Sequence, residues 1–252
     1  MKKPLNSNAL KYIAIIAMLI DHIAWAFVPL SSIWGQTMHF IGRFTAPIMC
    51  YFVAEGYFYT KDVKKYIFRI GIFSIISQMP FVIAEKLTSS PLTMIDGRLW
   101  INPELLIPSF NVMFTLMLGL IALAFWKIDI IEKPLRIMIV ISLCFISLSG
   151  DWMCFSVLWI LFFGIYRNDN KRKWISYYCI AISSILTTVI PNTLNSDVSL
   201  WRYSWQLGLL VPPLLLQLHS GERGNRNPFH KWFFYIFYPL HLLIIGIIKF
   251  YI

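Results

Sequence analysis

Apolar segments long enough to cross a lipid bilayer recur along the whole chain, and this pattern limits the fold more than any other feature. A transmembrane helix needs about 20 mainly apolar residues, because the hydrocarbon core is about 30 Å thick. Here 58% of the 252 residues are hydrophobic and only 13% are charged, whereas a soluble domain has about 25% charged residues. We therefore predict a polytopic integral membrane protein, with residues 1–252 forming a single transmembrane domain.

We expect an all-α fold, a bundle of about nine transmembrane helices. The predicted spans are 10–30, 39–58, 66–85, 108–126, 134–150, 152–167, 174–192, 200–218 and 232–250. The first apolar run is longer than that of a signal peptide and lacks a convincing small-residue cleavage site, so it is expected to stay as the first helix.

The Lys and Arg residues between these spans predict the orientation, since cytoplasmic loops carry an excess of both. With the N-terminus in the cytoplasm, fifteen of them fall in inside segments and three in outside segments. This asymmetry predicts an odd number of spans, a C-terminus outside and a multi-pass location in a membrane that faces the cytoplasm. It also accounts for the net charge of +10. We therefore expect membrane lipid, and not nucleic acid, as a partner of the protein.

Motifs that would indicate other chemistry are missing from the sequence. It has no GxSxG, HExxH or P-loop motif. The four cysteines lie in apolar segments without metal-ligand spacing, and the five histidines are scattered. We therefore expect no metal site. The sequence is compatible with a monomer or a homo-oligomer.

A few ionisable residues lie inside the predicted spans and are the candidates for function. Such groups cost about 2.5–3.5 kcal/mol each at the centre of a membrane helix, so they usually face the protein interior or a water-filled cavity. They are Lys11, Asp21, His22, Arg43, Glu55, Arg69 and His241.

Lys11 and His22 are predicted to share one face of the first helix. Eleven residues make three turns plus about 20°, and the rise between them is ~16 Å. With the N-terminus inside, Lys11 lies at the cytoplasmic mouth and His22 near the midplane. A cation at the rim suits an anionic ligand, and a deeper histidine suits proton transfer. The alternative is that Asp21 and His22 only tie helices together.

The other ionisable groups have both structural and functional interpretations. Asp21 points about 100° away from His22, and it could pair with Arg43 on the second helix. Glu55 and Arg69 lie at similar depths on neighbouring helices, and we expect either an ion pair or direct ligand contacts.

His241 follows Pro239 midway along the last span. The proline removes one backbone hydrogen bond, which can open or kink the helix there. His241 could then reach the same cavity as His22. The alternative is a buried packing residue.

The chain resembles the TraX family of membrane proteins, named for a pilin N-acetylation protein of conjugative plasmids. The resemblance covers most of the chain and rests on segments in the right order and spacing. They are "LKYIAIIAMLIDHIAWAF" (10–27), "IGRFTAPIMCYFVAEGYFYTKDVKKYIFRI" (41–70), "ISQMPF" (76–81), "NVMFTLMLGL" (111–120) and "FYIFYPLHLLII" (234–245). The family is similar to a wider group of transmembrane acyltransferases, in which a basic residue precedes the histidine of the first helix by ten intervening residues; Lys11 and His22 match that pattern.

The resemblance implies an acetyl-CoA-dependent acyltransferase with His22 as catalytic base or nucleophile. It would move an acetyl group to an amine or hydroxyl of a membrane-associated or exported acceptor, a peptide or a glycan. Asp21 would hold the site together, and Arg43 or Asn111 would stabilise the oxyanion. The expected CoA-binding residues are Lys11, Lys64, Lys65 and Arg69. The alternatives are a transporter or channel in which the same residues form an ion path, and a structural membrane protein.

Overall fold

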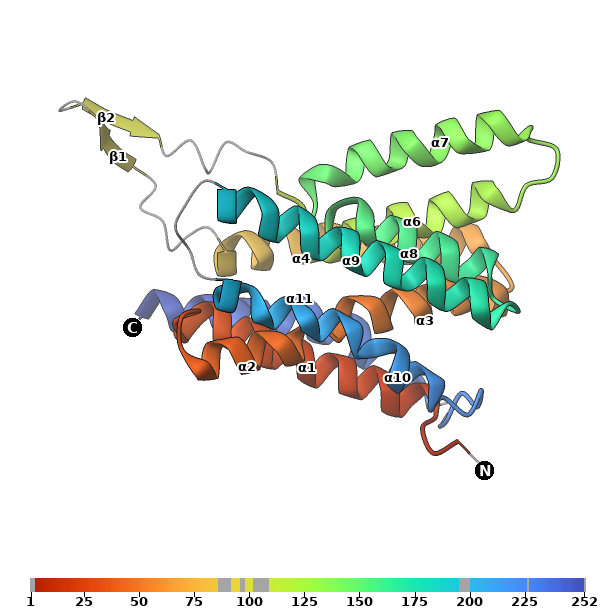
Figure 1. The fold of residues 1–252 in the computed structure, drawn as a ribbon, viewed down its shortest axis with the longest axis horizontal. Coiled ribbons are helices and arrows are strands. Elements are labelled where there is room, and N and C mark those ends of the chain that lie inside the picture. Colours follow the sequence, from red (N-terminus) through yellow and green to blue (C-terminus); the bar gives the residue numbers. More distant parts are fainter. Residues whose placement is uncertain are drawn as a thin grey trace.

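The computed structural model describes residues 3–85, 92–95, 98–101, 109–194, 200–225 and 227–251. The helices run back and forth along one long axis, and the two chain termini lie at opposite ends of the bundle (Figure 1). Within these described ranges, four helices are long and apolar enough to cross a membrane: Ser7–Phe27, Val63–Glu85, Asn170–Pro191 and Trp232–Tyr251. The prediction of a helical membrane protein is confirmed. We call the end of the bundle where α1 begins the N-terminal end and the opposite end the C-terminal end.

The number of nine spans stays a prediction, because the described helices differ from the predicted spans in length and bounds. In chain order the described helices are α1 (Ser7–Phe27), α2 (Ile33–Gly42), α3 (Thr45–Tyr59), α4 (Val63–Glu85), α6 (Val112–Trp126), α7 (Lys133–Ile146), η1 (Ser147–Ser149), α8 (Met153–Ile165), α9 (Asn170–Leu194), η2 (Leu200–Leu210), α10 (Pro212–Gln217) and α11 (Pro228–Tyr251).

The predicted span 39–58 is not one continuous helix. It divides at Arg43 and Phe44 into α2 and α3. The physical reason is Pro47, whose ring clashes with the carbonyl group four residues earlier and which cannot donate a backbone hydrogen bond. The break turns Arg43, the C-cap residue of α2, towards the bundle interior, where it meets α1.

The predicted span 200–218 also differs from a regular α-helix. Residues Leu200–Leu210 form a 3-10 helix, η2, and α10 follows from Pro212. The two consecutive prolines at 212 and 213 lack backbone N–H groups, so an α-helical ladder cannot continue through them.

A short β-hairpin makes the all-α prediction incomplete. Strands β1 (Leu92–Ile95) and β2 (Arg98–Ile101) pair antiparallel. They project beyond the helices at the C-terminal end (Figure 1). The hairpin lies in the long connection between α4 and α6, where the sequence predicted no regular structure.

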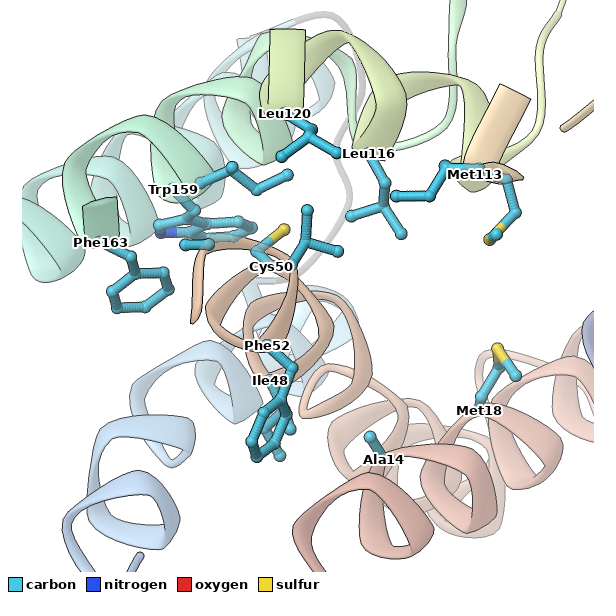
Figure 2. Close-up of a cluster of buried hydrophobic side chains, with 14 of the residues drawn as sticks. Ala14, Met18, Ile48, Cys50, Phe52, Met113, Leu116, Leu120, Trp159 and Phe163 are labelled. Carbon is cyan, nitrogen blue, oxygen red and sulfur yellow. The ribbon is translucent and has the colours of Figure 1, made fainter. Parts of the chain in front are cut away.

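The core lies where α3 packs between α1 on one side and α6 and α8 on the other. Figure 2 shows Ala14 and Met18 of α1, Ile48, Cys50 and Phe52 of α3, and Leu116, Leu120 and Trp159 beyond them. All of these side chains are buried. Helix α7 has only Val140 buried and lies at the edge of the bundle (Figure 1). The interior of the bundle, where the site lies, is therefore built mainly from α1, α3, α4, α6, α8 and α11.

Candidate functional site

A cavity of about 550 Å³ opens at the N-terminal end of the bundle. Its walls come from α1, α3, α4, α6 and α11 and from the segment that follows α10. Apolar side chains line its deeper part: Met49, Val53, Ile70, Met113 and Leu116. Polar and charged groups gather near its mouth, so the cavity has a charged rim and an apolar floor.

Four cations line the cavity: Lys11, Lys61, Arg69 and Arg223. The ammonium group of Lys11 lies 5.1 Å from the ring centre of Phe52. Arg69 donates from Nε to the Tyr235 hydroxyl at 3.1 Å. An aromatic face and a hydroxyl therefore contact Lys11 and Arg69 without neutralising their charge.

Two of the four predicted CoA-binding residues lie elsewhere. Lys11 and Arg69 line the cavity, but Lys64 and Lys65 do not. The side chain of Lys65 is 85% exposed and pairs with Asp62 at 3.6 Å. The first turn of α4 presents Lys64 and Lys65 to the outside, because the face that packs inward carries Tyr66 and Ile70.

Of the two interpretations of Glu55 and Arg69, the ion pair between them is wrong, although both residues line the cavity. Glu55 accepts two hydrogen bonds from Arg167, both at 2.9 Å, from Nε and from a terminal guanidinium nitrogen. The reason is helix packing: α3 packs against α8, which ends beside Arg167, whereas α4 packs against α11 and brings Arg69 to Tyr235.

Hydrogen bonds between the N-terminal residues and the segment after α10 frame the mouth of the cavity. Ser220 donates its backbone N–H to the Leu5 carbonyl at 2.8 Å, and Ser7 donates its own to the Glu222 carbonyl at 2.9 Å. The Ser7 hydroxyl and His219 Nε2 are hydrogen-bonded at 3.0 Å. Burial lowers the pKa of His219, so its neutral form is favoured at this rim.

His22 and His241 meet in the interior, as expected for two histidines that share a site. Nε2 of His241 lies 3.1 Å from Nδ1 of His22, and the two ring centres are 4.9 Å apart. Each Nδ1 also lies near the carbonyl group four residues earlier in its own helix: Met18 for His22, at 2.9 Å, and Phe237 for His241, at 2.8 Å.

Asp21 does not contact His22 by hydrogen bonding but forms a buried cluster with two residues at the end of α2. It accepts a hydrogen bond from His39 Nδ1 at 2.7 Å and one from the Arg43 guanidinium at 2.9 Å. The expected pairing of Asp21 with Arg43 is thus confirmed. Gly42 makes the approach possible, since a Cβ at this position would overlap the Asp21 carboxyl group.

Two indole rings enclose the Arg43 guanidinium. Its central carbon lies 4.6 Å from the ring centre of Trp152 and 4.6 Å from that of Trp205. Trp152 has a φ of 63°, a left-handed conformation that is uncommon for a bulky residue. The Arg43 Nε is buried and has no hydrogen-bond partner among the described residues. It is therefore a buried donor whose hydrogen no described residue accepts.

Asn111, the other expected oxyanion donor, has its amide fully occupied. Its Nδ2 donates to the Ser74 carbonyl and to Gln78 Oε1, both at 2.8 Å. Its Oδ1 accepts from the Met113 backbone N–H at 3.0 Å and so caps α6. An oxyanion would have to displace one of these bonds.

The cavity lining includes Lys11 but neither His22 nor His241, so the histidine pair lies outside the lining of this cavity. Met18, whose carbonyl group is bonded to His22, and Met113 of the cavity floor face each other in Figure 2. Methionine side chains are flexible and adapt to irregular spaces. Both side chains are buried, and Met113 belongs to the apolar floor of the cavity.

A family model for TraX proteins matches residues 6–249, almost the whole chain. The chain belongs to the TraX family. It is also 32% identical over 242 residues to the probable fimbrial assembly protein FimC, serogroup H1, of Dichelobacter nodosus, covering 94% of this chain and 92% of that protein. No solved structure matches the chain.

Some residues of this TraX family site were not among the sequence-based candidates. His39 was placed at the edge of a predicted span, and its spacing of four from Arg43 is the signal that puts both on one helix face. Lys61 and Arg223 were counted only as loop charges. Their place in the cavity depends on how the segments between helices fold back, which helical periodicity does not reveal.

Proposed function

We propose that this TraX family protein is a membrane acetyltransferase that takes an acetyl group from cytoplasmic acetyl-CoA. The acceptor is an amine or hydroxyl of an envelope or exported molecule. The observation that carries the proposal is the cavity with a cationic rim and an apolar floor, with a hydrogen-bonded histidine pair buried in the same helix bundle.

The cavity suits a donor that is anionic at one end and apolar at the other. Phosphate groups of CoA would meet Lys11, Lys61, Arg69 and Arg223 at the rim, since guanidinium and ammonium groups bind phosphate well. Glu55 is no obstacle, because Arg167 neutralises it. The acyl end of the donor would point to the apolar floor at Met113, and movement of the flexible Met18 and Met113 side chains would admit it to His22.

At His22 we propose general-base catalysis. The Nε2 lone pair takes the proton of the acceptor amine or hydroxyl as its nitrogen or oxygen attacks the acetyl carbonyl carbon. The tetrahedral intermediate collapses, the carbon–sulfur bond breaks, and the thiolate takes the proton back from His22. The unpartnered Nε of Arg43 is the better candidate for the oxyanion donor, because Asn111 has no free amide hydrogen.

The orientation follows the distribution of positive charge. We propose that the N-terminal end of the bundle faces the cytoplasm of a bacterium and that the cavity opens there, where the donor is available. Reporter fusions after Ile252 and within residues 168–173 test this. Opposite sides are expected, and the same side for both would contradict the orientation.

The name of the Dichelobacter relative suggests one class of acceptor. A fimbrial subunit that passes through or lies in the membrane would present an amine or hydroxyl at the depth of His22. Transfer of radioactive acetyl groups from acetyl-CoA to acid-insoluble material should occur in membranes that contain the protein, and not in membranes that lack it.

Calorimetry with the purified protein tests the donor assignment. Wild type is expected to bind acetyl-CoA, and Lys11→Ala is expected to weaken binding more than it slows turnover at saturating donor. Lys65→Ala is the matched control, because it removes the same charge outside the cavity. No affinity of wild type for acetyl-CoA would reject the donor and favour a transporter.

His22→Asn tests the base. It should lower the transfer rate by about 10²–10⁴ with donor affinity kept, and His241→Asn should lower it less. Folded yield in detergent is compared for both variants. A well-folded His22→Asn protein with the wild-type rate would remove His22 from the mechanism.

A further inference from the structure

Two carbonyl groups define which ring nitrogens of the histidine pair carry hydrogen. Met18 O lies 2.9 Å from Nδ1 of His22, and Phe237 O lies 2.8 Å from Nδ1 of His241. A carbonyl oxygen only accepts hydrogen bonds. Each Nδ1 must therefore be the donor, and in a neutral ring the other nitrogen, Nε2, has a lone pair.

This assignment gives the contact between the rings a direction. Nε2 of His241 accepts, so the Nδ1–H of His22 is shared between Met18 O and His241 Nε2, at 2.9 and 3.1 Å. Nε2 of His22 is then the free basic nitrogen of the pair. It has no hydrogen-bond partner within the part of the chain that the structure describes.

The neighbouring carboxylate is not available for this role. In many hydrolases a carboxylate orients the catalytic histidine, and Asp21 directly precedes His22 in the sequence. However, its two oxygens are occupied, Oδ1 by His39 and Oδ2 by Arg43. The partner that His22 does have comes from α11, 219 residues later in the chain.

We propose that His241 is a positioning residue that fixes His22 in its Nδ1–H tautomer and shares the proton that His22 accepts. This inference rests on the proposed function, because it concerns the base of the same reaction. It assigns to the last helix of the chain a part in the chemistry of the first helix.

The proton balance of the step is simple. When the acceptor's proton binds to Nε2 of His22, the ring becomes a cation and its Nδ1–H bond to His241 becomes charge-assisted, and hence stronger. The Nδ1–H bond of His22 can then break as an N–H bond forms at Nε2 of His241. His22 is left neutral with its hydrogen on Nε2. Its bare Nδ1 now faces the Met18 carbonyl, which is unfavourable, so the proton on His241 returns to Nδ1 of His22. The hydrogen on Nε2 of His22 is then given to the CoA thiolate.

The charged and titratable groups around the pair are balanced. Asp21 on the same helix is paired with Arg43 and His39 of the α2 end. From α11, Tyr238 packs its ring 5.7 Å from that of His241, and its hydroxyl accepts from the Val112 backbone N–H. The extra proton would therefore rest mainly on the two imidazole rings.

The test combines nitrogen NMR with two substitutions at position 241. Protein labelled with ¹⁵N-histidine in detergent should show a hydrogenated Nδ1 and a bare Nε2 in both rings, and a coupling across the N–H···N bond between them. His241→Gln keeps an acceptor near the Nε2 position but cannot take a proton, whereas His241→Leu keeps bulk without an acceptor.

We expect His241→Leu to lower kcat about ten- to hundredfold with KM for acetyl-CoA unchanged, since a hydrogen bond to a charged group is lost. In this variant the His22 signals should show mixed tautomers. His241→Gln should restore the Nδ1–H tautomer and part of the rate. Wild-type kcat in a folded His241→Leu protein would overturn the inference while leaving His22 as the base. Hydrogenated Nε2 in neutral His22 would overturn it as well, even if no acetyl transfer were found.

Discussion

Breaking the ion pair between Asp21 and Arg43 should destabilise the protein more than removing the pair altogether. The pair is buried, with side-chain exposures of 12% for Asp21 and 13% for Arg43. Asp21→Asn leaves a guanidinium between two indole rings without its counter-charge, and Arg43→Met leaves a carboxylate with His39 as its remaining partner. Removing one member of a buried pair typically costs about 3–5 kcal/mol.

The double variant Asp21→Asn/Arg43→Met should recover much of this loss. The Asn side chain keeps an oxygen for the His39 Nδ1–H, and Met packs well against aromatic rings such as Trp152 and Trp205. Removing both charges together is often close to neutral. We therefore expect the sum of the two single-variant losses of unfolding free energy to exceed the loss in the double variant by about 2 kcal/mol or more. Residues in contact show coupling of this size.

Unfolding in mixed micelles with increasing dodecyl sulfate, followed by tryptophan fluorescence, measures these free energies. Arg202→Met serves as a control for the loss of a positive charge at the same end of the bundle. The expected coupling is refuted if the losses of unfolding free energy in the two single variants sum to the loss in the double variant within about 0.5 kcal/mol. Two residues that stabilise the protein through a shared ion pair give non-additive losses. The double variant is expected to transfer acetyl groups slowly even where it is stable, because it lacks the Arg43 Nε that we propose as the oxyanion donor.

Two further predictions concern pH and pairing. Burial, followed by the negative charge of Glu85, raises the pKa of Asp151 to about 7 in the turn before α8. Ionisation of Asp151 therefore lowers the stability of the folded state as the pH rises from about 4 to 7. Asp151→Asn should be more stable than wild type at pH 8, and the difference in unfolding free energy should shrink on acidification to pH 4. A constant difference would contradict this. Because Glu55 pairs with Arg167 and not with Arg69, Glu55→Gln should couple energetically with Arg167→Gln and be additive with Arg69→Gln in the same unfolding assay. Additivity with Arg167→Gln would contradict the pairing.

The bundle itself could be predicted because a bilayer imposes a simple length rule on the sequence. Every backbone polar group in hydrocarbon must be satisfied internally, so long apolar runs fold as helices, divided where prolines interrupt the hydrogen-bond ladder. Helical periodicity likewise sufficed for facts within one element, such as Lys11 and His22 on one continuous helix. The burial cost of a charge also predicted that Asp21 needs a partner, and Arg43 is that partner.

Tertiary packing decided what the sequence left open or got wrong. Glu55 pairs with Arg167 because α3 packs against α8, which ends beside Arg167. No local sequence pattern specifies that packing choice. The cavity walls join segments far apart in the chain, so Arg223 became a rim residue while Lys65 stayed outside. The contact of His22 with His241 bridges 219 residues. A sequence specifies where polar groups lie along each helix, but only the packing of helices against one another decides which of those groups meet.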